Sequence, residues 1–424
     1  MVAANPDFTV VGGGIGGLVV ARRLAMGGAS VRLLEASDRL GGTVSSHTLA
    51  GIELDAGPES YALRGGAVAT LLSEFGLAAD LVAPTGDSAW LQQTAARAVR
   101  LPATSRLGIP GVPMAADVIE AIGMRGARRA QLDSLMPALE GKPDLTLGAL
   151  VRKRMGAAVL DRLVAPVVQG VYSRHPDELL VDRVAPGLRL AVARLGGLAI
   201  AVREDEASVP GKAVGGIRGG IHRLAAELVK DLVIFGVDVR LGTRVESLGE
   251  LGDDAGQVIM AAPGLLPDSG SSGTGVTLVT LVTDAPGLID DPRGSGILVA
   301  AEAQQGGGIR AKALTHLTAK WPWLRESAGG LEVIRLSYAQ RPELEQARLD
   351  AVTLLGVALP AASILDSDLI DFTRAAQITA PPGMLVVGEQ VAGAGLASII
   401  TQAEDVARGL LSSRDPDESA RMDE

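Results

Sequence analysis

The sequence predicts an α/β protein, and three observations support this class. Short apolar runs of strand type alternate with segments of helical periodicity, a glycine-rich turn joins the first such pair at residues 12–17, and a second strand, glycine turn and helix follow one another near residue 390. Such alternation is typical of a parallel sheet covered by helices. With 424 residues, 47% of them hydrophobic, the chain is long enough for two or three domains with buried cores.

The first strand and helix enclose a glycine fingerprint. Residues 8–11 are apolar, residues 18–26 have helical spacing, and between them the glycines follow the pattern Gly-x-Gly-x-x-Gly. The first glycine of such a pattern permits a tight turn, the second lets the backbone approach a pyrophosphate, and the third lets helix and strand pack closely. Unpaired N–H groups at the helix start favour the negative charge. This predicts a Rossmann-type dinucleotide-binding unit with contacts at Gly12, Gly13, Gly14, Ile15, Gly16 and Gly17.

The residues after the fingerprint favour FAD over NAD. A second strand, residues 30–35, ends in an acid at the spacing expected for a residue that accepts from ribose hydroxyls. An Arg-Leu-Gly-Gly turn at 39–42 and a Gly-Pro-Glu-Ser segment at 57–60 follow. A nicotinamide dehydrogenase has no use for this second glycine turn, whereas an extended flavin needs the chain to return beside its ribityl arm and ring. The predicted contacts are Glu35, Ala36, Arg39, Gly42, Gly57, Pro58, Glu59 and Ser60.

Composition narrows the chemistry further. The chain contains no cysteine, which excludes disulfides, thiolate metal sites, a cysteine nucleophile and a flavin attached through sulfur, so we expect non-covalent FAD. The four histidines share no metal-ligand spacing, and we expect no metal. A net charge of −10 and 2% aromatic residues oppose nucleic-acid binding. The sequence shows neither a leader nor an apolar run of about eighteen residues, so we expect a cytoplasmic protein without a transmembrane segment.

At the residues above, the chain resembles the flavin amine oxidase superfamily, which carries the glycine fingerprint, the R-x-G-G turn and a flavin-closing segment near the carboxyl terminus. Here that last element is a strand ending in Gly-Glu, followed by Gly-Ala-Gly-Leu and a helix over about 397–411. The resemblance implies that both ends of the chain meet on one FAD and that one valine touches the adenine through its backbone. The implied contacts are Val245, Gly388, Glu389, Ala394, Gly395 and Leu396.

Within that superfamily, the middle of the chain resembles the oxygen-dependent protoporphyrinogen or coproporphyrinogen oxidases. The similar segments are residues 53–64, 99–113, 163–188 and 311–324. The resemblance implies an FAD-dependent oxidase of heme biosynthesis that converts a porphyrinogen to the porphyrin with O2 as acceptor, upstream of a ferrochelatase. Coproporphyrinogen III is favoured over protoporphyrinogen IX because a chain without an evident membrane anchor suits the more polar tetra-acid. The sequence leaves the oligomeric state open.

The chain departs from that family's pattern before the last FAD strand. The family carries a Trp-x-x-x-x-Pro-x-Tyr segment and roughly twenty further residues there, whereas residues 372–381 here lead almost directly into the strand. The stretch after residue 246 is also short. Two alternatives therefore stay open: a divergent flavin amine oxidase or desaturase with another substrate, and a paralogue that binds FAD or porphyrin without turnover.

The resemblance also implies two substrate residues. Arg106 corresponds to an arginine near a substrate carboxylate, and a guanidinium can hold a carboxylate through two hydrogen bonds. Gly170 corresponds to a catalytic glycine whose backbone lies against the macrocycle, near the flavin. The alternative interpretations are a solvated surface arginine and a glycine that ends a helix.

We predict three domains and a tail. The FAD-binding domain comprises residues 1–88, 205–264 and 375–412, the sheet-based substrate domain 89–111 and 265–374, the helical lobe 112–204, and the acidic tail 413–424. A flexible loop is expected at residues 270–275 because five of those six residues are glycine or serine.

Overall fold

The computed structural model describes residues 5–63, 65–85, 89–137, 144–172, 174–205, 214–265, 273–393 and 395–414. The chain divides into two compact units, each assembled from separate pieces of sequence. The first unit comprises Met1–Val82, Val214–Val276 and Phe372–Glu424, and the second comprises Ala83–Ala213 and Thr277–Asp371. The helical segment and the second sheet both belong to the second unit. The three-domain division given above stays a prediction.

The first unit is built on a five-stranded parallel sheet in the order β12-β2-β1-β13-β19. All four residues of the central strand β1 are buried, as expected for a parallel strand covered on both faces. The strands are β1 Phe8–Val11, β2 Val31–Leu34, β12 Asp238–Arg240, β13 Gln257–Met260 and β19 Leu385–Val386. Two smaller sheets pair β3 Ser46–Leu49 with β4 Ile52–Asp55, and β11 Val214–Ile217 with β5 Tyr61–Ala62 and β6 Leu81–Val82.

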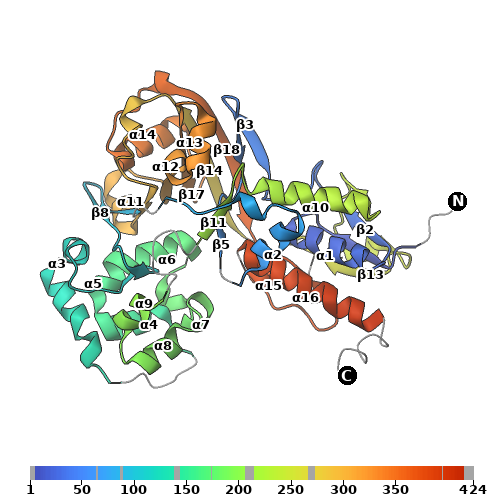
Figure 1. Ribbon diagram of the computed structural model, residues 1–424, viewed down its shortest axis with the longest axis horizontal. Coiled ribbons are helices and arrows are strands. Elements are labelled where there is room, and N and C mark those ends of the chain that lie inside the picture. The colour runs from blue at the N-terminus through green and yellow to red at the C-terminus, as the bar shows by residue number, and fades with distance from the viewer. Residues whose placement is uncertain are drawn as a thin grey trace. The chain divides into compact units, whose positions relative to one another are not determined.

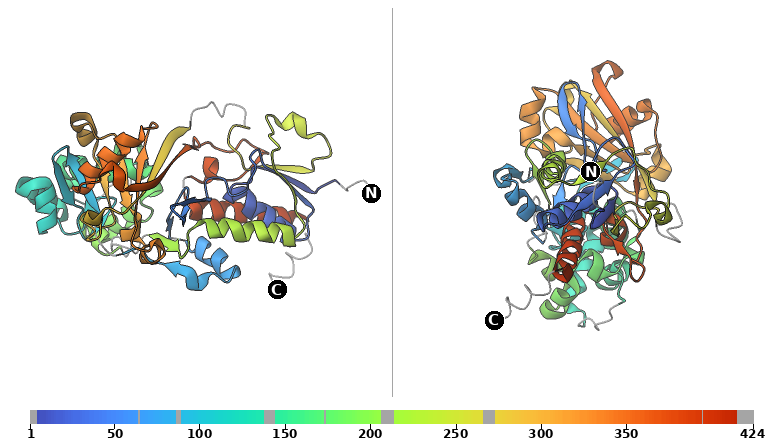
Figure 2. Two further views of the ribbon diagram at one scale, coloured as in Figure 1. Left: turned by 90° about the horizontal axis from the view of Figure 1, so that it is seen from above. Right: turned by 90° about the vertical axis from the view of Figure 1, so that its right-hand side faces the viewer.

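Three long helices of the first unit lie together. Helix α1 (Ile15–Met26) lies between α10 (His222–Ile234) and α16 (Leu396–Arg414), as Figure 1 shows, and the left view of Figure 2 shows α10 and α16 on one side of the strands. Their apolar faces form one buried cluster with the sheet, which includes Leu18 of α1 and Ile400 of α16. The shorter helices of this unit are α2 Ala67–Glu74 and α15 Glu389–Ala392.

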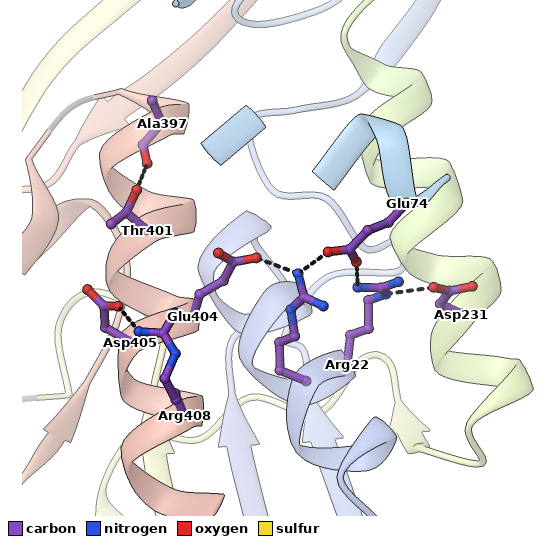
Figure 3. A network of polar contacts seen from close by, with 9 residues as sticks. Arg22, Glu74, Asp231, Ala397, Thr401, Glu404, Asp405 and Arg408 are labelled. Carbon is purple, nitrogen blue, oxygen red and sulfur yellow. Dashed lines mark hydrogen bonds and ion pairs between the residues drawn. The ribbon is translucent and has the colours of Figure 1, made fainter. Parts of the chain in front are cut away.

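Two arginines of α1 tie these helices to one another (Figure 3). Arg22 is buried and pairs with Glu74 of α2 (Nη1–Oε2, 2.7 Å) and Asp231 of α10 (Nε–Oδ2, 2.6 Å). Nη2 of Arg23 lies 2.6 Å from a carboxylate oxygen of both Glu74 and Glu404, which α16 carries. Helix α1 is thereby held to its three neighbours by charge-assisted hydrogen bonds as well as by apolar packing.

The second unit contains a seven-stranded sheet in the order β18-β14-β17-β16-β15-β7-β8. The paired strands with known register run antiparallel, except that β15 and β7 are parallel. The strands are β7 Trp90–Thr94, β8 Arg97–Arg100, β14 Thr274–Thr283, β15 Gly296–Val299, β16 Ala313–His316, β17 Glu332–Tyr338 and β18 Ile364–Arg374. The boundary between the two units falls within β14 and β18. The helices associated with this sheet are α11 Ala301–Gly307, α12 Leu317–Lys320, α13 Pro322–Ala328 and α14 Leu344–Leu355.

The helical part of the second unit has its own apolar core. A hairpin of β9 Ser105–Arg106 and β10 Ile109–Pro110 leads into it. Its helices are α3 Ala116–Gln131, α4 Leu147–Met155, α5 Ala157–Val159, a π-helical turn Leu160–Val164, α6 Ala165–Tyr172, α7 Val181–Val184, α8 Leu188–Leu195 and α9 Leu198–Arg203. Arg154 and Asp133 form an ion pair inside this core, each with a side chain no more than 2% exposed.

The structure corrects several predicted boundaries. The first helix begins at Ile15 rather than at residue 18, because the glycine turn leads straight into it. The predicted tail begins too early, since Ser413 and Arg414 still belong to α16, and the rest of the tail lies outside the described residues. The predicted loop at 270–275 is wrong at Thr274 and Gly275, which open β14; residues 270–272 are not among those described. Among the described residues, no helix combines the length and apolar character needed to cross a bilayer.

Candidate cofactor and substrate sites

The glycine fingerprint forms a sharp turn between β1 and α1. Gly12 has φ +112°, a backbone conformation that residues other than glycine rarely adopt. A Cβ there would lie 2.7 Å from the backbone nitrogen of Ala262. A Cβ at Gly17 would collide with the carbonyl oxygen of Gly12, so the helix lies directly against the turn. Gly13 and Gly16 are also enclosed, by Leu40 and by the backbone of Gly388. Gly12 and Gly17 therefore need glycine because backbone atoms fill the space of a Cβ, whereas Gly13 and Gly16 are only tightly packed.

Gly14 differs from the other glycines of the fingerprint. A Cβ at this position would meet nothing within 4 Å, and Gly14 is the N-cap of α1 with extended backbone (φ −72°, ψ 175°). The first N–H groups of a helix have no partner inside it, and they point out of the helix beside this open space. The second glycine of the fingerprint is thus the position at which an anion can approach the backbone closely.

Glu35 follows the end of β2 and contacts the fingerprint. Its Oε2 accepts from the Gly13 N–H (2.7 Å), and its Oε1 accepts from the N–H and the hydroxyl of Ser37 (both 2.8 Å). Burial raises the pKa of the Glu35 carboxyl, but these hydrogen bonds outweigh burial, so the pKa lies below its usual value. The carboxylate therefore stays ionised and keeps lone pairs with which it can accept from hydroxyl groups.

The second glycine turn lies beside the first. The Gly41 N–H donates to the Gly13 carbonyl (2.8 Å), and a Cβ on Gly42 would lie 3.1 Å from the Gly14 Cα. Arg39 is exposed, and its guanidinium donates to the Gly42 carbonyl (2.9 Å). The two glycine-rich segments therefore form one continuous backbone surface.

Residues 57–60 continue from that surface. A Cβ on Gly57 would collide with the Thr43 carbonyl, so this segment lies against the second glycine turn, while residues 58–60 are half-buried. The preceding Asp55 holds the start of α10: its carboxylate accepts from the N–H groups of Ile221 (2.9 Å) and His222 (2.8 Å). Asp55 is not among the predicted contacts. Its position at the end of a strand, two residues before a glycine, is the sequence signal that could have indicated its role in holding a helix start.

The carboxyl-terminal segment reaches the same turn. Gly388 has φ +102° and lies next to Gly16, whose Cβ would be 3.1 Å from the Gly388 Cα. Gln402 of α16 accepts from the Gly388 N–H (3.2 Å) and donates to the Val386 carbonyl (2.8 Å), which no sequence pattern indicated. Burial raises the pKa of the Glu389 carboxyl. Gly395 is exposed and Leu396 is buried at the start of α16, while Ala394 lies outside the described residues.

The remaining predicted contacts of the first unit lie near the end of β2. Ala36 is exposed beside Glu35, and Val245 is half-buried in the segment after β12. That segment is held to β2, because the Thr243 N–H donates to the Glu35 carbonyl (2.8 Å). The structure thus gathers the two glycine turns, Glu35, the segment with Val245 and the Gly388 turn around one edge of the parallel sheet. This is the edge at which α/β folds bind their ligands.

The two predicted substrate residues lie in the second unit. Arg106 has a side chain 11% exposed, and its guanidinium pairs with the Asp205 carboxylate and donates to the Pro186 carbonyl (3.3 Å). Gly170 lies inside α6, two residues before its end, and is exposed. A Cβ there would lie 3.2 Å from Cδ2 of Leu298 in β15. Arg106 therefore already has an acidic partner, whereas Gly170 presents a surface without a side chain.

A family model described as flavin containing amine oxidoreductase matches residues 15–263 of this chain. Coproporphyrinogen III oxidase of Mycobacterium bovis is 27% identical over 447 aligned positions, which cover 94% of this chain and 95% of that enzyme. Coproporphyrinogen III oxidase of Propionibacterium freudenreichii is 28% identical, over 59% of this chain and 54% of that enzyme. Protoporphyrinogen oxidase 1 of spinach chloroplasts is 26% identical, over 53% and 42%.

Solved structures share the fold. The "Putative protoporphyrinogen oxidase" from Exiguobacterium sp. 255-15 matches with a TM-score of 0.81 at 20% identity, covering 97% of this chain and 99% of that one. A putrescine oxidase bound to putrescine matches with a TM-score of 0.62 at 16% identity, covering 96% and 99%. At such identities the likeness concerns the fold alone, which is the predicted α/β flavin amine oxidase type.

Proposed function

Because this chain belongs to the flavin containing amine oxidoreductase family, we propose that it is an FAD-dependent oxidase that converts a porphyrinogen to the porphyrin with O2 as acceptor. Coproporphyrinogen III is the favoured substrate and protoporphyrinogen IX the next. The observation that carries this proposal is the extent of the similarity to a coproporphyrinogen III oxidase, which covers 94% of this chain. The product would serve an enzyme of ferrochelatase type, which inserts a metal into a porphyrin.

The first unit fits FAD at several points. The open space beside Gly14 and the start of α1 suits a pyrophosphate, which the unpaired N–H groups would bind. The ionised Glu35 carboxylate would accept from ribose hydroxyls. The backbone of residues 57–60 and the Gly388 turn would lie along the remaining length of the cofactor. When bound, the flavin supplies a ring that accepts hydride from carbon and is reoxidised by O2.

In the second unit, Gly170 would hold the reacting face of the substrate. It is exposed on α6, and the Leu298 side chain lies beside the position that a Cβ would take, so a flat ligand that approaches the helix backbone there would pack against Leu298. Arg106 as a carboxylate-binding residue stays a prediction, and a substrate carboxylate would have to compete there with Asp205.

The test is anaerobic mixing of the purified flavoprotein with coproporphyrinogen III and, separately, with protoporphyrinogen IX. We expect the visible flavin absorbance to bleach while porphyrin fluorescence rises, faster with coproporphyrinogen III, and we expect peroxide once O2 is admitted. A flavin that both porphyrinogens leave oxidised would contradict the proposal. In that case, bleaching by a panel of amines would indicate an amine oxidase, and porphyrin binding without bleaching would indicate a paralogue without turnover.

The cofactor site is tested separately with Gly14→Ala. The added methyl group meets no protein atom within 4 Å, so we expect the melting temperature of the apoprotein to stay unchanged. Because that methyl group would occupy the space proposed for the pyrophosphate, the dissociation constant for FAD should rise about 5- to 150-fold, as one misplaced group at a close backbone contact costs about 1–3 kcal/mol. Unchanged FAD affinity would show that the pyrophosphate lies elsewhere.

A further inference from the structure

A cavity of about 200 Å³ lies in the second unit, beside the helical segment that carries Gly170. Successive residues of that segment line it on one face, and the start of α11 faces them. The polar groups at the cavity are Gln93, Asp161, Arg162, Gln169, His175 and Glu302. None of these residues is among the cofactor or substrate contacts predicted from the sequence.

Arg162 is the arginine that lines this cavity, and its side chain is exposed. Within the described residues, its guanidinium makes no ion pair and no hydrogen bond. Three other arginines nearby are neutralised: Arg106 by Asp205, Arg152 by Asp177 and Arg154 by Asp133. Arg125, Arg128, Arg183, Arg194 and Arg203 likewise have no side-chain partner within the described residues, but none of them lines this cavity, so Arg162 is the arginine that can meet an anionic ligand there.

The backbone of Arg162 is nevertheless held firmly. It lies in the π-helical turn Leu160–Val164, and π turns are common at functional sites because they widen the helix and re-aim its side chains. The buried amide of Gln93 donates to the Arg162 carbonyl (3.3 Å) and to the Ala121 carbonyl (3.0 Å). A strand of the sheet thus anchors the turn, and the guanidinium keeps all of its donors for a ligand.

Two further groups can donate at the same cavity. The Gln169 side-chain amide has no hydrogen-bond partner within the described part of the chain. Nδ1 of His175 accepts from the Asp177 N–H (3.2 Å) and lies 3.4 Å from Oδ2 of Asp177, so within the described residues Nε2 is the ring nitrogen without a protein partner. One guanidinium, one amide and one imidazole N–H form a set of donors suited to a carboxylate.

The cavity adjoins the surface at Gly170. Gln169 precedes Gly170 in α6, and Ala300, which lines the cavity, lies two residues after Leu298 on the strand side. At 1.5 Å per residue, Arg162 and Gly170 are about 12 Å apart along the helix axis, a distance that an arginine side chain and an acidic arm of the ligand can span together. A flat ligand over Gly170 would thus direct such an arm into the cavity.

We propose that this cavity is the subsite for one propionate of the tetra-acid substrate, with Arg162 as the residue that binds its carboxylate and selects the tetra-acid over the di-acid. This inference rests on the function proposed above. The cavity is polar and partly open, which suits a charged propionate and not the apolar vinyl group that replaces it in the di-acid. Asp161 and Glu302 face the same cavity and oppose the anion, so they limit its affinity.

The test compares Arg162→Gln with Arg128→Gln, which removes the same charge from an exposed residue of α3 outside the cavity. The readout is equilibrium binding of coproporphyrin III and protoporphyrin IX, followed by the porphyrin absorbance shift, together with KM for both porphyrinogens. We expect Arg162→Gln to weaken coproporphyrin III binding about tenfold or more, the effect of losing a hydrogen bond to a charged group, and to change protoporphyrin IX binding little. Arg128→Gln should leave both unchanged.

A second variant tests whether the cavity binds a negatively charged group. Glu302→Gln removes an opposing charge and should tighten coproporphyrin III binding a few-fold. Unchanged or weaker binding in Glu302→Gln, an unchanged affinity in Arg162→Gln, or an equal loss for both porphyrins would overturn the subsite. If the wild type oxidises coproporphyrinogen III in those cases, the proposed function stands and only the subsite fails. If the wild type neither binds nor oxidises either tetrapyrrole, both fail.

Discussion

The glycine-lined edge of the first unit is formed mainly by backbone atoms, whereas the Arg162 cavity of the second unit is formed mainly by side chains. The first is a backbone surface: Gly12, Gly41 and Gly388 hold left-handed or extended turns, and Gly14 leaves open space. The second is a set of side chains contributed by β7, a π turn and the start of α11. A site formed by the backbone fixes the spacing of glycines in the sequence, whereas a site formed by side chains from remote segments leaves no such spacing.

The ion pairs inside the first unit also differ from the ion pair inside the second unit. In the first unit, Arg22 and Arg23 share three carboxylates from three helices, and each pair keeps some contact with solvent. In the second, Arg154 is buried with a single carboxylate and donates to three carbonyl groups, those of Asp133, Pro137 and Gly196. Asp133 also accepts from the Ala199 N–H (2.8 Å). Losing one partner of the shared, partly exposed network leaves other pairs in place, whereas in the buried pair it leaves a charge without a counter-ion.

The largest effect is expected from Arg154→Met, which tests this difference. The change leaves Asp133 buried without its counter-ion, and it should lower the free energy of unfolding by about 3–5 kcal/mol. We expect porphyrin binding, assigned to the second unit, to be lost at lower urea than the FAD fluorescence change of the first. Arg152→Gln is the control, because Arg152 lies on the same helix as Arg154 but its ion pair with Asp177 is exposed, so the midpoint should stay unchanged. Simultaneous loss of both signals would contradict the distinction.

A smaller effect is expected from Gly17→Ala, set against the Gly14→Ala variant above. A methyl group at residue 17 collides with the Gly12 carbonyl, so α1 must move, at a cost of about 1–3 kcal/mol. Gly17→Ala should therefore lower both the melting temperature of the apoprotein and the affinity for FAD, whereas Gly14→Ala lowers only the affinity. Calorimetry of the apoproteins and FAD titration separate the two effects. An unchanged apoprotein melting temperature for Gly17→Ala would show that the turn tolerates a Cβ.

The smallest expected effect concerns two carboxylates with lowered pKa values. Glu35 owes its low pKa to N–H groups and a hydroxyl of its own turn, while Glu332 is buried among His316, Thr318 and Arg325, whose hydrogen bonds and charges outweigh the rise that burial causes. A carboxyl group whose pKa is lower in the folded than in the unfolded protein stabilises the fold at pH values above its unfolded pKa, which is 4.5 for Glu332. This contribution is lost as the pH falls through the pKa of the folded protein.

Glu332→Gln should accordingly lower the free energy of unfolding by about 1 kcal/mol at neutral pH, and the difference from wild type should shrink below about pH 4.5. Urea unfolding at a series of pH values measures both. A difference that is constant, or that grows as pH falls, would contradict the assigned sign. The same scan on Glu35→Gln with and without FAD shows whether the Glu35 carboxylate acts on the fold or on the cofactor.

The sequence predicted the local structure around the glycine turns, while the role of these residues in binding FAD stays a prediction. The strand at 8–11, the fingerprint, the acid at Glu35, the second glycine turn and the strand and helix around Gly388 all lie where the parallel sheet brings them to one edge. These features are local, since each couples a turn to the strand or helix beside it. The sequence analysis overlooked Gln402 and gave no hint that Arg106 has Asp205 as a partner, 99 positions away in the chain.

What the sequence determined by itself is the class of fold and the need for glycine at the turns, because backbone conformation and close packing restrict which residue can stand there. Which arginine lines the cavity of the second unit without an acidic partner was decided only by the tertiary structure. Arg106, Arg152, Arg154 and Arg162 have the same chemistry in the sequence, and three of them are neutralised by acids that the fold brings to them. Charge pairing depends on distances between segments that are remote in the chain, and those distances exist only after folding.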